Sequence, residues 1–94
     1  MNREELFEKI VSILKGYEAK KIAVFGSYAR SEASPESDID ILVEFSGRRS
    51  LLELVRIERE LSEALDVKVD LLTEKSISPY LVERIRKEAK VIYE

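Results

Sequence analysis

The 94-residue chain contains no cysteine and no histidine. Without cysteine, the chain can form neither a disulfide nor a thiolate metal site. Without histidine, it lacks the commonest general base and the commonest zinc ligand. Any catalysis by this chain must therefore use carboxylates, lysine, tyrosine or a metal ion held by oxygen ligands.

The sequence also lacks long apolar runs and a strong excess of charge of either sign. No run approaches the ~18 residues of a membrane-spanning helix, and no signal peptide is visible. We therefore expect a cytoplasmic protein without membrane contact. Nineteen acidic residues against 16 basic ones leave a net charge of −3. Since this balance gives no basic field to attract nucleic acid, we expect no direct nucleic-acid binding.

What the chain does contain is enough apolar sequence for one small folded domain. Hydrophobic residues make up 45% of it, which is an ordinary share for a globular protein. A domain of this size buries a real but thin core. No repeat, low-complexity segment or long linker is visible, so residues 1–94 are expected to form a single domain.

Apolar periodicity and turn signals predict helices and strands in alternation. The expected helices cover residues 3–15, 28–33, 51–65 and 79–89, and the expected strands cover residues 21–25, 38–45, 67–72 and 91–93. The last helix is expected to turn Leu81, Val82, Ile85 and Ala89 toward the sheet. This order predicts an α/β (α+β) domain, with a four-strand mixed sheet and helices packed mainly on one face.

The second predicted strand carries aspartates, which are uncommon in strands. Side chains of a strand alternate between its two faces. The odd-numbered residues of 39–45 are all apolar and must face the core, which puts Asp38 and Asp40 on the open face. The same alternation puts Asp70 of the third strand on the open face. If the two strands are neighbours, the three carboxylates gather on one patch.

Three like charges a few ångströms apart are unfavourable unless one carboxyl stays protonated or a cation enters. Because all the candidate ligands are hard oxygen donors, Mg²⁺ or Mn²⁺ is the natural cation. The alternative is that Asp38 only ends a turn, and that Asp40 and Asp70 are solvated strand residues. The rarity of clustered aspartates in strands favours the metal site.

Gly26 and Ser27 follow the first predicted strand directly and form a second candidate site. Glycine lets the backbone approach a ligand closely, and Ser27 stands where a short helix would begin and favour a phosphate. A plain turn with a serine cap explains the pair equally well. Arg30 can either reach a phosphate oxygen or pair with a surface glutamate. Arg48 and Arg49 are expected in a solvated loop.

The spacing Gly26-Ser27, ten residues, Asp38-x-Asp40, with the later Asp70, resembles the nucleotidyltransferase superfamily related to DNA polymerase β. The segments "GSYARSEASPESDIDILVEF", "VKVDLLT" and "SISPYLVERIRKEAKVIYE" resemble more closely the minimal nucleotidyltransferases, the antitoxin half of HEPN–MNT toxin–antitoxin pairs. The similarity covers nearly the whole chain and implies the nucleotidyltransferase fold.

The resemblance also implies roles for the candidate residues. Gly26 and Ser27 would hold the triphosphate of ATP, and Asp38 and Asp40 would bind two Mg²⁺ ions. Asp70 would hold one of these ions and accept the proton of the attacking hydroxyl. All three aspartates would thus be catalytic as well as metal ligands, which agrees with the need of phosphoryl transfer for charge neutralisation.

The function implied by the resemblance is that of a Mg-dependent protein adenylyltransferase. It would transfer AMP from ATP to a hydroxyl, with a tyrosine of a cognate HEPN ribonuclease toxin as the expected acceptor, and would neutralise the toxin within a hetero-oligomer. One alternative is an antitoxin that neutralises by docking without catalysis, against which the complete aspartate set argues. The other is a transferase for a small molecule, against which the missing substrate-binding domain argues.

Overall fold

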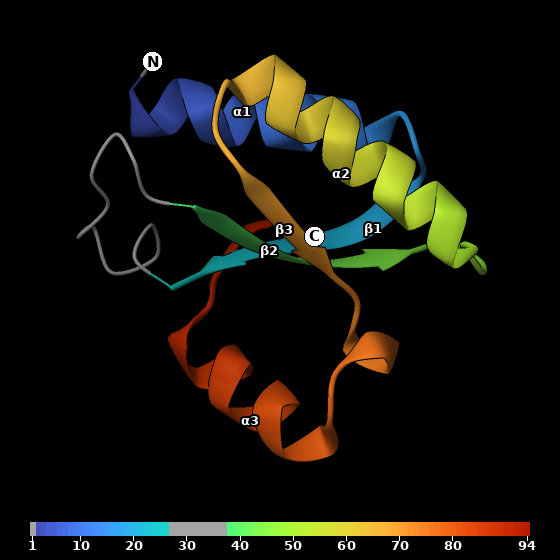
Figure 1. The fold of residues 1–94 in the computed structure, drawn as a ribbon. Coiled ribbons are helices and arrows are strands. Elements are labelled where there is room, and N and C mark those ends of the chain that lie inside the picture. Colours follow the sequence, from blue (N-terminus) through green and yellow to red (C-terminus); the bar gives the residue numbers. More distant parts are fainter. Residues whose placement is uncertain (1, 27–37) are drawn as a thin grey trace.

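The computed structural model describes residues 2–26 and 38–94 (Figure 1). Its elements are α1 (Arg3–Lys15), β1 (Ala19–Phe25), β2 (Ile39–Phe45), α2 (Leu51–Leu65), β3 (Val69–Leu72), the short 3-10 helix η1 (Glu74–Ser76), α3 (Pro79–Glu88) and β4 (Lys90–Tyr93). The predicted order of longer helices and strands is confirmed. The short helix predicted within residues 28–33 lies outside the described residues.

The first two helices begin where the sequence offers a capping side chain. Asn2 Oδ1 accepts a hydrogen bond from the backbone N–H of Glu5 at 2.8 Å, and Ser50 Oγ accepts one from the N–H of Glu53 at 3.2 Å. Each such cap satisfies a backbone donor that has no partner inside the helix. Helix α2 ends at Leu65, and the capping residue Asp66 has a left-handed φ of 54° that turns the chain toward β3.

The four strands form one mixed sheet in the order β3-β2-β1-β4. β1 pairs antiparallel with both β2 and β4, whereas β2 and β3 are parallel. Parallel neighbours need a long crossover, and α2 supplies it. The predicted four-strand mixed sheet is therefore confirmed, and β2 lies between β1 and β3.

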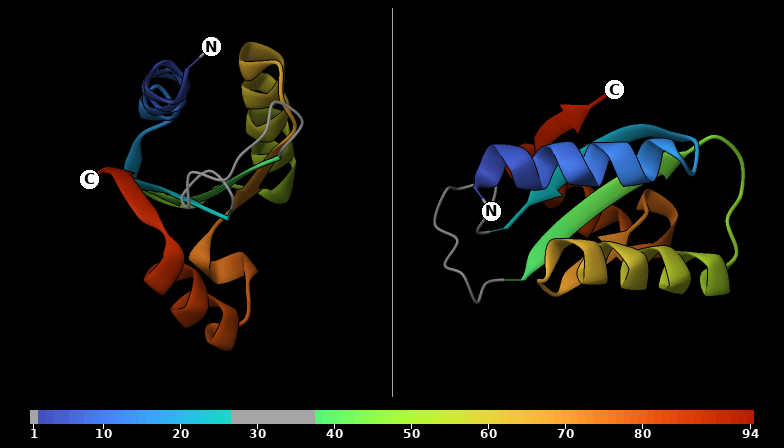
Figure 2. Two further views of the ribbon diagram at one scale, coloured as in Figure 1. Left: turned by 90° about the vertical axis from the view of Figure 1, so that its left-hand side faces the viewer. Right: turned by 90° about the horizontal axis from the view of Figure 1, so that it is seen from above.

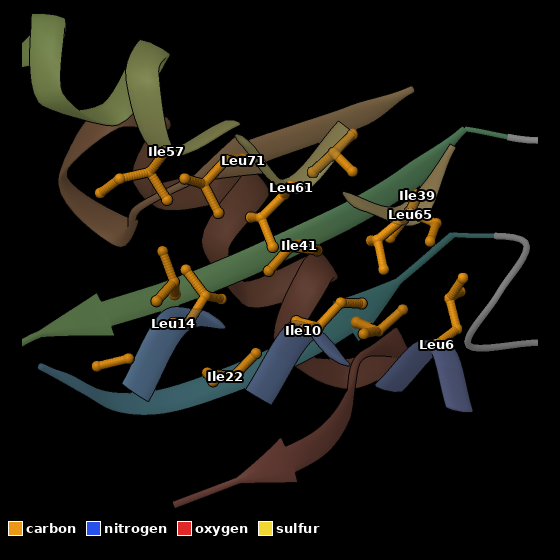
Figure 3. Close-up of a cluster of buried hydrophobic side chains, with 14 of the residues drawn as sticks. Leu6, Ile10, Leu14, Ile22, Ile39, Ile41, Ile57, Leu61, Leu65 and Leu71 are labelled. Carbon is orange, nitrogen blue, oxygen red and sulfur yellow. The ribbon is translucent and has the colours of Figure 1, made fainter. Parts of the chain in front are cut away.

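Helices α1 and α2 cover one face of the sheet and enclose the core with it (Figures 1 and 2). The odd-numbered residues of β2 face this core, as predicted, since Ile39 and Ile41 are fully buried and Val43 and Phe45 nearly so. Figure 3 shows how their partners from the helices meet them. The helix side chains of the core are Leu6, Ile10, Leu14, Ile57, Leu61 and Leu65.

Helix α3 lies on the opposite face of the sheet (Figures 1 and 2). Ala23 and Leu42 point to this face and are only 4% and 7% exposed. No residue of α3 itself is buried. Leu81, predicted to turn inward, is 48% exposed, so the prediction is wrong for this residue. In the described part of the chain, no helix is long and apolar enough to cross a membrane.

Candidate active site

The parallel register of β2 and β3 places Asp40 directly opposite Asp70. On its other side, Asp40 lies opposite Phe25 of β1. Because Ile39 and Ile41 point into the core, the alternation of the strand turns the Asp40 side chain to the α3 face of the sheet. Two of the three predicted carboxylates are therefore cross-strand neighbours.

The Asp40 carboxyl is strongly perturbed by this environment. Its pKa is raised to about 6, first by partial burial and then by the charge of Asp70, a side-chain hydrogen bond with Asp70 and the charge of Asp38. Each of these effects disfavours the ionised form of Asp40. Below about pH 6 a proton relieves the repulsion between the carboxylates, and a divalent cation can relieve it in the same way.

Asp38 lies just before β2, and its nearest charged partner is a lysine and not a second carboxylate. Its Oδ2 lies 3.9 Å from Nζ of Lys68, and both side chains are substantially exposed. The strands meet here, since the backbone N–H of Ile39 donates to the carbonyl of Lys68 at 2.9 Å. Lys68 received no role from the sequence, although the alternation that exposes Asp70 puts Lys68 on the same face. It brings one positive charge to the edge of the acidic group.

Gly26 belongs to the same group of residues. Its φ is +74°, in the left-handed region that side chains disfavour. A Cβ built on Gly26 would lie 2.5 Å from Oδ2 of Asp40. The missing side chain thus makes room for the Asp40 carboxylate, whereas the close approach of the Gly26 backbone to a ligand stays a prediction.

The chemistry of the donors fits a magnesium ion only in part. Within residues 2–26 and 38–94, no group of three or more acidic, histidine or cysteine side chains is placed to hold a metal ion. The pair Asp40 and Asp70 supplies hard oxygen donors and excess negative charge. Mg²⁺ is commonly held by one or two carboxylates, with waters and substrate phosphates completing its octahedron. The pair therefore suits an ion that arrives with a nucleotide.

Two of the predicted nucleotide-binding residues, Ser27 and Arg30, lie outside the described residues. Their role as phosphate ligands stays a prediction. Gly26, the residue before them, ends β1 on the strand that borders Asp40. The described part of the site therefore consists of Gly26, Asp38, Asp40, Lys68 and Asp70.

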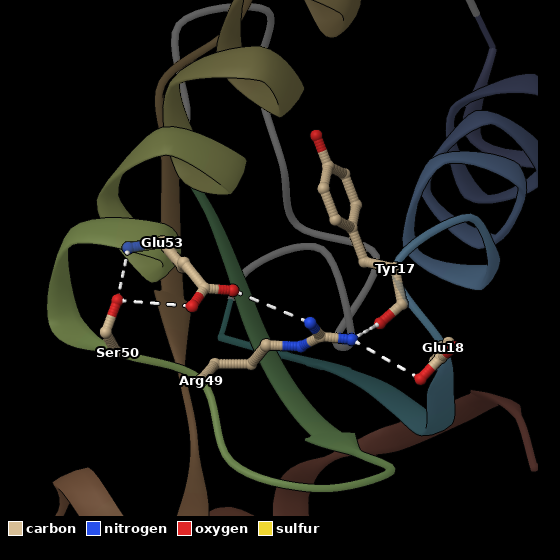
Figure 4. Close-up of polar contacts among 5 residues, drawn as sticks. All are labelled: Tyr17, Glu18, Arg49, Ser50 and Glu53. Carbon is tan, nitrogen blue, oxygen red and sulfur yellow. Dashed lines mark hydrogen bonds and ion pairs between the residues drawn. The ribbon is translucent and has the colours of Figure 1, made fainter.

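Arg49, which the sequence assigned to a solvated loop, has a structural position instead. It donates a hydrogen bond to the backbone carbonyl of Tyr17 and forms ion pairs with Glu53 at 3.5 Å and Glu18 at 3.7 Å (Figure 4). Its guanidinium lies 5.4 Å from the centre of the Phe45 ring. The prediction is wrong for Arg49 because the turn after α1 supplies partners that local sequence does not reveal.

Comparison with known proteins shows the family of this chain. A family model described as a nucleotidyltransferase domain matches residues 4–92. The chain belongs to the nucleotidyltransferase domain family. The resemblance found in the sequence is therefore confirmed, and the strands that carry Asp40 and Asp70 lie within the matched range.

A relative of this nucleotidyltransferase occurs in Methanocaldococcus jannaschii. It is provisionally named protein adenylyltransferase MJ0435 and is 52% identical over 89 residues, covering 95% of this chain and 96% of its own. Identity at this level over nearly complete chains means that the two proteins share the whole domain. The name of this relative describes an adenylyltransferase that acts on proteins.

Two solved structures share the fold of this nucleotidyltransferase. One is a toxin–antitoxin with AMP-PNP, with a TM-score of 0.85, 28% identity and coverage of 93% of this chain and 72% of the solved one. The other is a tri-AMPylated HEPN toxin from Shewanella oneidensis in complex with MNT antitoxin, with a TM-score of 0.82, 26% identity and coverage of 98% and 72%. The predicted nucleotidyltransferase fold is confirmed by these similarities.

Proposed function

We propose that this nucleotidyltransferase transfers AMP from ATP to a hydroxyl, expected to be a tyrosine, of a HEPN toxin and so neutralises the toxin. The observation that carries the proposal is the cross-strand pair of Asp40 and Asp70, in which the pKa of Asp40 is raised to about 6. A shifted carboxyl beside a second carboxylate is typical of a catalytic or metal-binding site. The names of the relative and of the solved complexes support the choice of reaction and partner.

In the proposed reaction, the acceptor oxygen forms a bond to the α-phosphorus of ATP, and the bond from that phosphorus to the pyrophosphate oxygen breaks. Asp70 accepts the proton of the acceptor hydroxyl, since a carboxylate can serve as general base in a chain without histidine. Mg²⁺ held by Asp40 and Asp70, with Asp38 beside them, would supply neutralisation of the phosphate charge. Asp40 must be ionised for this, so its raised pKa favours cation binding above about pH 6.

The nucleotide's triphosphate is expected at Gly26 and the two residues predicted with it, Ser27 and Arg30. Gly26 supports this because its backbone has no side chain on the Asp40 side. An arginine can form paired hydrogen bonds with phosphate oxygens, and the N–H groups at the start of the helix predicted at residues 28–33 would favour an anion. Together they would hold the leaving pyrophosphate beside the carboxylates.

A second candidate function is neutralisation by docking alone. Three large apolar side chains at the start of α2 favour it, since Leu51, Leu52 and Val55 are 76%, 80% and 55% exposed. Neighbouring exposed apolar residues are typical of surfaces that bind another protein. The two candidates differ in whether covalent transfer is needed for neutralisation.

The experiment that separates them uses ATP labelled at the α-phosphate, Mg²⁺ and the cognate HEPN toxin. We expect the wild-type chain to label the toxin, and the Asp38→Asn/Asp40→Asn double variant to lose labelling at least 100-fold. Asp66→Asn is the matched control, because it removes an aspartate at the end of α2. If the double variant still neutralises the toxin and the wild type transfers no label, the enzyme proposal is wrong and docking explains neutralisation.

A further inference from the structure

Two side chains of α2 form hydrogen bonds with the backbone of β3, one on each side of Asp70. Glu58 Oε2 accepts a hydrogen bond from the N–H of Leu71 at 2.8 Å, and Ser62 Oγ accepts one from the N–H of Val69 at 3.1 Å. Both hydrogen bonds are partly buried. The outer edge of the strand that carries Asp70 is therefore held by α2.

This support matters because β3 is a short strand at the edge of the sheet. It contains only Val69–Leu72, and within the described sheet it pairs with β2 alone. The outer edge of such a strand presents backbone N–H groups that no neighbouring strand satisfies. Glu58 and Ser62 supply the acceptors that a fifth strand would otherwise provide.

The two acceptors on α2 are spaced like the two donors on β3. Glu58 and Ser62 are four residues apart, which places them on one side of the helix, about 6 Å apart along its axis. Alternate residues of a strand are about 6.6 Å apart. The later helix residue bonds to the earlier strand residue, so the helix and the strand run in opposite directions. Two matched contacts fix the position of β3 along α2, whereas a single one would let the strand pivot.

Ser62 also fixes the turn that leads from α2 into β3. Its backbone carbonyl accepts hydrogen bonds from the N–H groups of Asp66 and Val67, the second at 3.3 Å. From the other side, the N–H of Ile39 in β2 donates to the carbonyl of Lys68 at 2.9 Å. The chain is therefore held from both edges where β3 begins.

We propose that Glu58 and Ser62 are positioning residues that hold Asp70 opposite Asp40. The inference rests on the proposed function, because the separation of the two carboxylates determines how well they share a divalent cation. Both side chains bond to the backbone of β3, so they act through Asp70 and not on the substrate. Removal of groups that orient metal ligands commonly lowers metal affinity or activity by about 10- to 100-fold.

The test measures the affinity of the full chain for Mn²⁺ by calorimetric titration, without nucleotide or toxin. Glu58→Ala removes the acceptor, so we expect Mn²⁺ to bind about 10-fold more weakly. Glu58→Gln removes the charge but keeps an oxygen that can accept the same hydrogen bond, so we expect an affinity within about twofold of wild type. Glu60→Ala is the matched control, because Glu60 of the same helix accepts from the Tyr17 hydroxyl at 2.9 Å. We expect it to bind Mn²⁺ like the wild type.

Transfer of AMP to the toxin is the second measurement. In Glu58→Ala we expect kcat at saturating ATP and Mg²⁺ to fall about 10-fold and the KM for the toxin to stay within about twofold. Ser62→Ala is a second variant with a smaller change, for which we expect Mn²⁺ affinity and kcat to fall about threefold. Circular dichroism establishes which variants are folded at 25 °C, and Ser62→Ala carries the test if Glu58→Ala does not fold.

Wild-type Mn²⁺ affinity in the folded Glu58→Ala and Ser62→Ala variants would overturn the inference. Equal weakening in Glu58→Gln and Glu58→Ala would also overturn it, because the charge of Glu58 would then explain the effect. Equal weakening in Glu60→Ala would overturn it by assigning the effect to the general packing of α2. A wild-type chain that binds Mn²⁺ but transfers no AMP would contradict the proposed function alone, and the Mn²⁺ comparison would still test the inference.

Discussion

The Asp40 carboxylate lies against the position that a side chain at Gly26 would occupy. A Cβ at position 26 would come within 2.5 Å of Asp40 Oδ2, which is closer than non-bonded atoms can approach. The end of β1 and the acidic residue of β2 are therefore coupled sterically. A change at Gly26 must move either the backbone or the Asp40 carboxylate.

Gly26→Ala is expected to impair both stability and transfer. A left-handed φ costs a side-chain residue roughly 1–2 kcal/mol, and the contact with Asp40 adds to this cost. We expect a loss of about 1–2 kcal/mol in the free energy of unfolding in urea and at least a 10-fold loss in the rate of AMP transfer.

Gly47→Ala is the matched control for this substitution. Gly47 has a φ of +97°, and no atom lies within 4 Å of a Cβ built there. The Gly47→Ala variant should therefore lose stability through backbone strain and keep the wild-type transfer rate. Equal loss of transfer in both variants would mean that strain, and not displacement of Asp40, explains the effect at Gly26.

The raised pKa of Asp40 predicts a stability that falls as pH rises. The carboxyl takes up its proton more readily in the folded chain, with a pKa of about 6 against an ordinary 3.8. Its stabilising contribution is complete below about pH 4 and is lost as pH rises through about 6. Because the carboxyl is only partly buried, solvent screening limits the effect to roughly 1 kcal/mol.

Asp40→Asn removes this titration and should raise the free energy of unfolding at pH 7.5 by about 1 kcal/mol relative to wild type. At pH 4 the difference should vanish, since wild-type Asp40 is then protonated. Urea unfolding of the wild type and the variant measures this difference in free energy at pH 7.5 and at pH 4. Asp66→Asn is the control. If the free energy of unfolding of the wild type does not fall relative to that of Asp40→Asn between pH 4 and pH 7.5, the assignment of the raised pKa to Asp40 is wrong.

Lys68→Met is expected to strengthen the binding of divalent cations. The ammonium of Lys68 lies 3.9 Å from Asp38 and repels a cation that approaches this carboxylate. Exposed pairs of this kind contribute up to ~1 kcal/mol, so we expect Mn²⁺ affinity to rise by about two- to fivefold. Lys87→Met, at an exposed position of α3, is the control. Weaker Mn²⁺ binding in Lys68→Met would instead mean that Lys68 orders Asp38 for the metal.

Arg49→Ala is expected to destabilise the chain without affecting transfer. The substitution removes the hydrogen bond to Tyr17 and the contact with the Phe45 ring, at the opposite end of β2 from Asp40. We expect a loss of about 1–3 kcal/mol in the free energy of unfolding and an unchanged transfer rate at 25 °C. Arg48→Ala, at an exposed neighbour, should change neither. A lower transfer rate in folded Arg49→Ala would show that this arginine also serves the site.

The sequence predicted the part of the site that depends on alternation along a strand. The apolar odd-numbered residues of β2 can face only the core, so Asp40 had to face away from it. The adjacency of Asp40 and Asp70 needed one further condition, that β2 and β3 are neighbours. That condition depends on the α2 crossover and on tertiary packing. Sequence patterns within one segment predict such packing only weakly.

Contacts between distant segments could not be predicted in this way. The contact of Gly26 with Asp40 depends on the antiparallel register of β1 and β2, and the partners of Arg49 come from the turn after α1. Helix α3 packs on the second face, where amphipathic spacing overestimated the burial of Leu81. In each case the deciding quantity is a distance between segments, and periodicity within one segment contains no information about it.

The shallow packing of α3 has a consequence for the motions of the chain. Because none of its residues is buried, few apolar contacts oppose its detachment, and local opening should require much less free energy than global unfolding. Amide hydrogens of α3 should then exchange with solvent far sooner than those of β1 and β2, whose core residues are sealed beneath α1 and α2. The paired aspartates, by contrast, stay fixed on strands that belong to the slowly exchanging core.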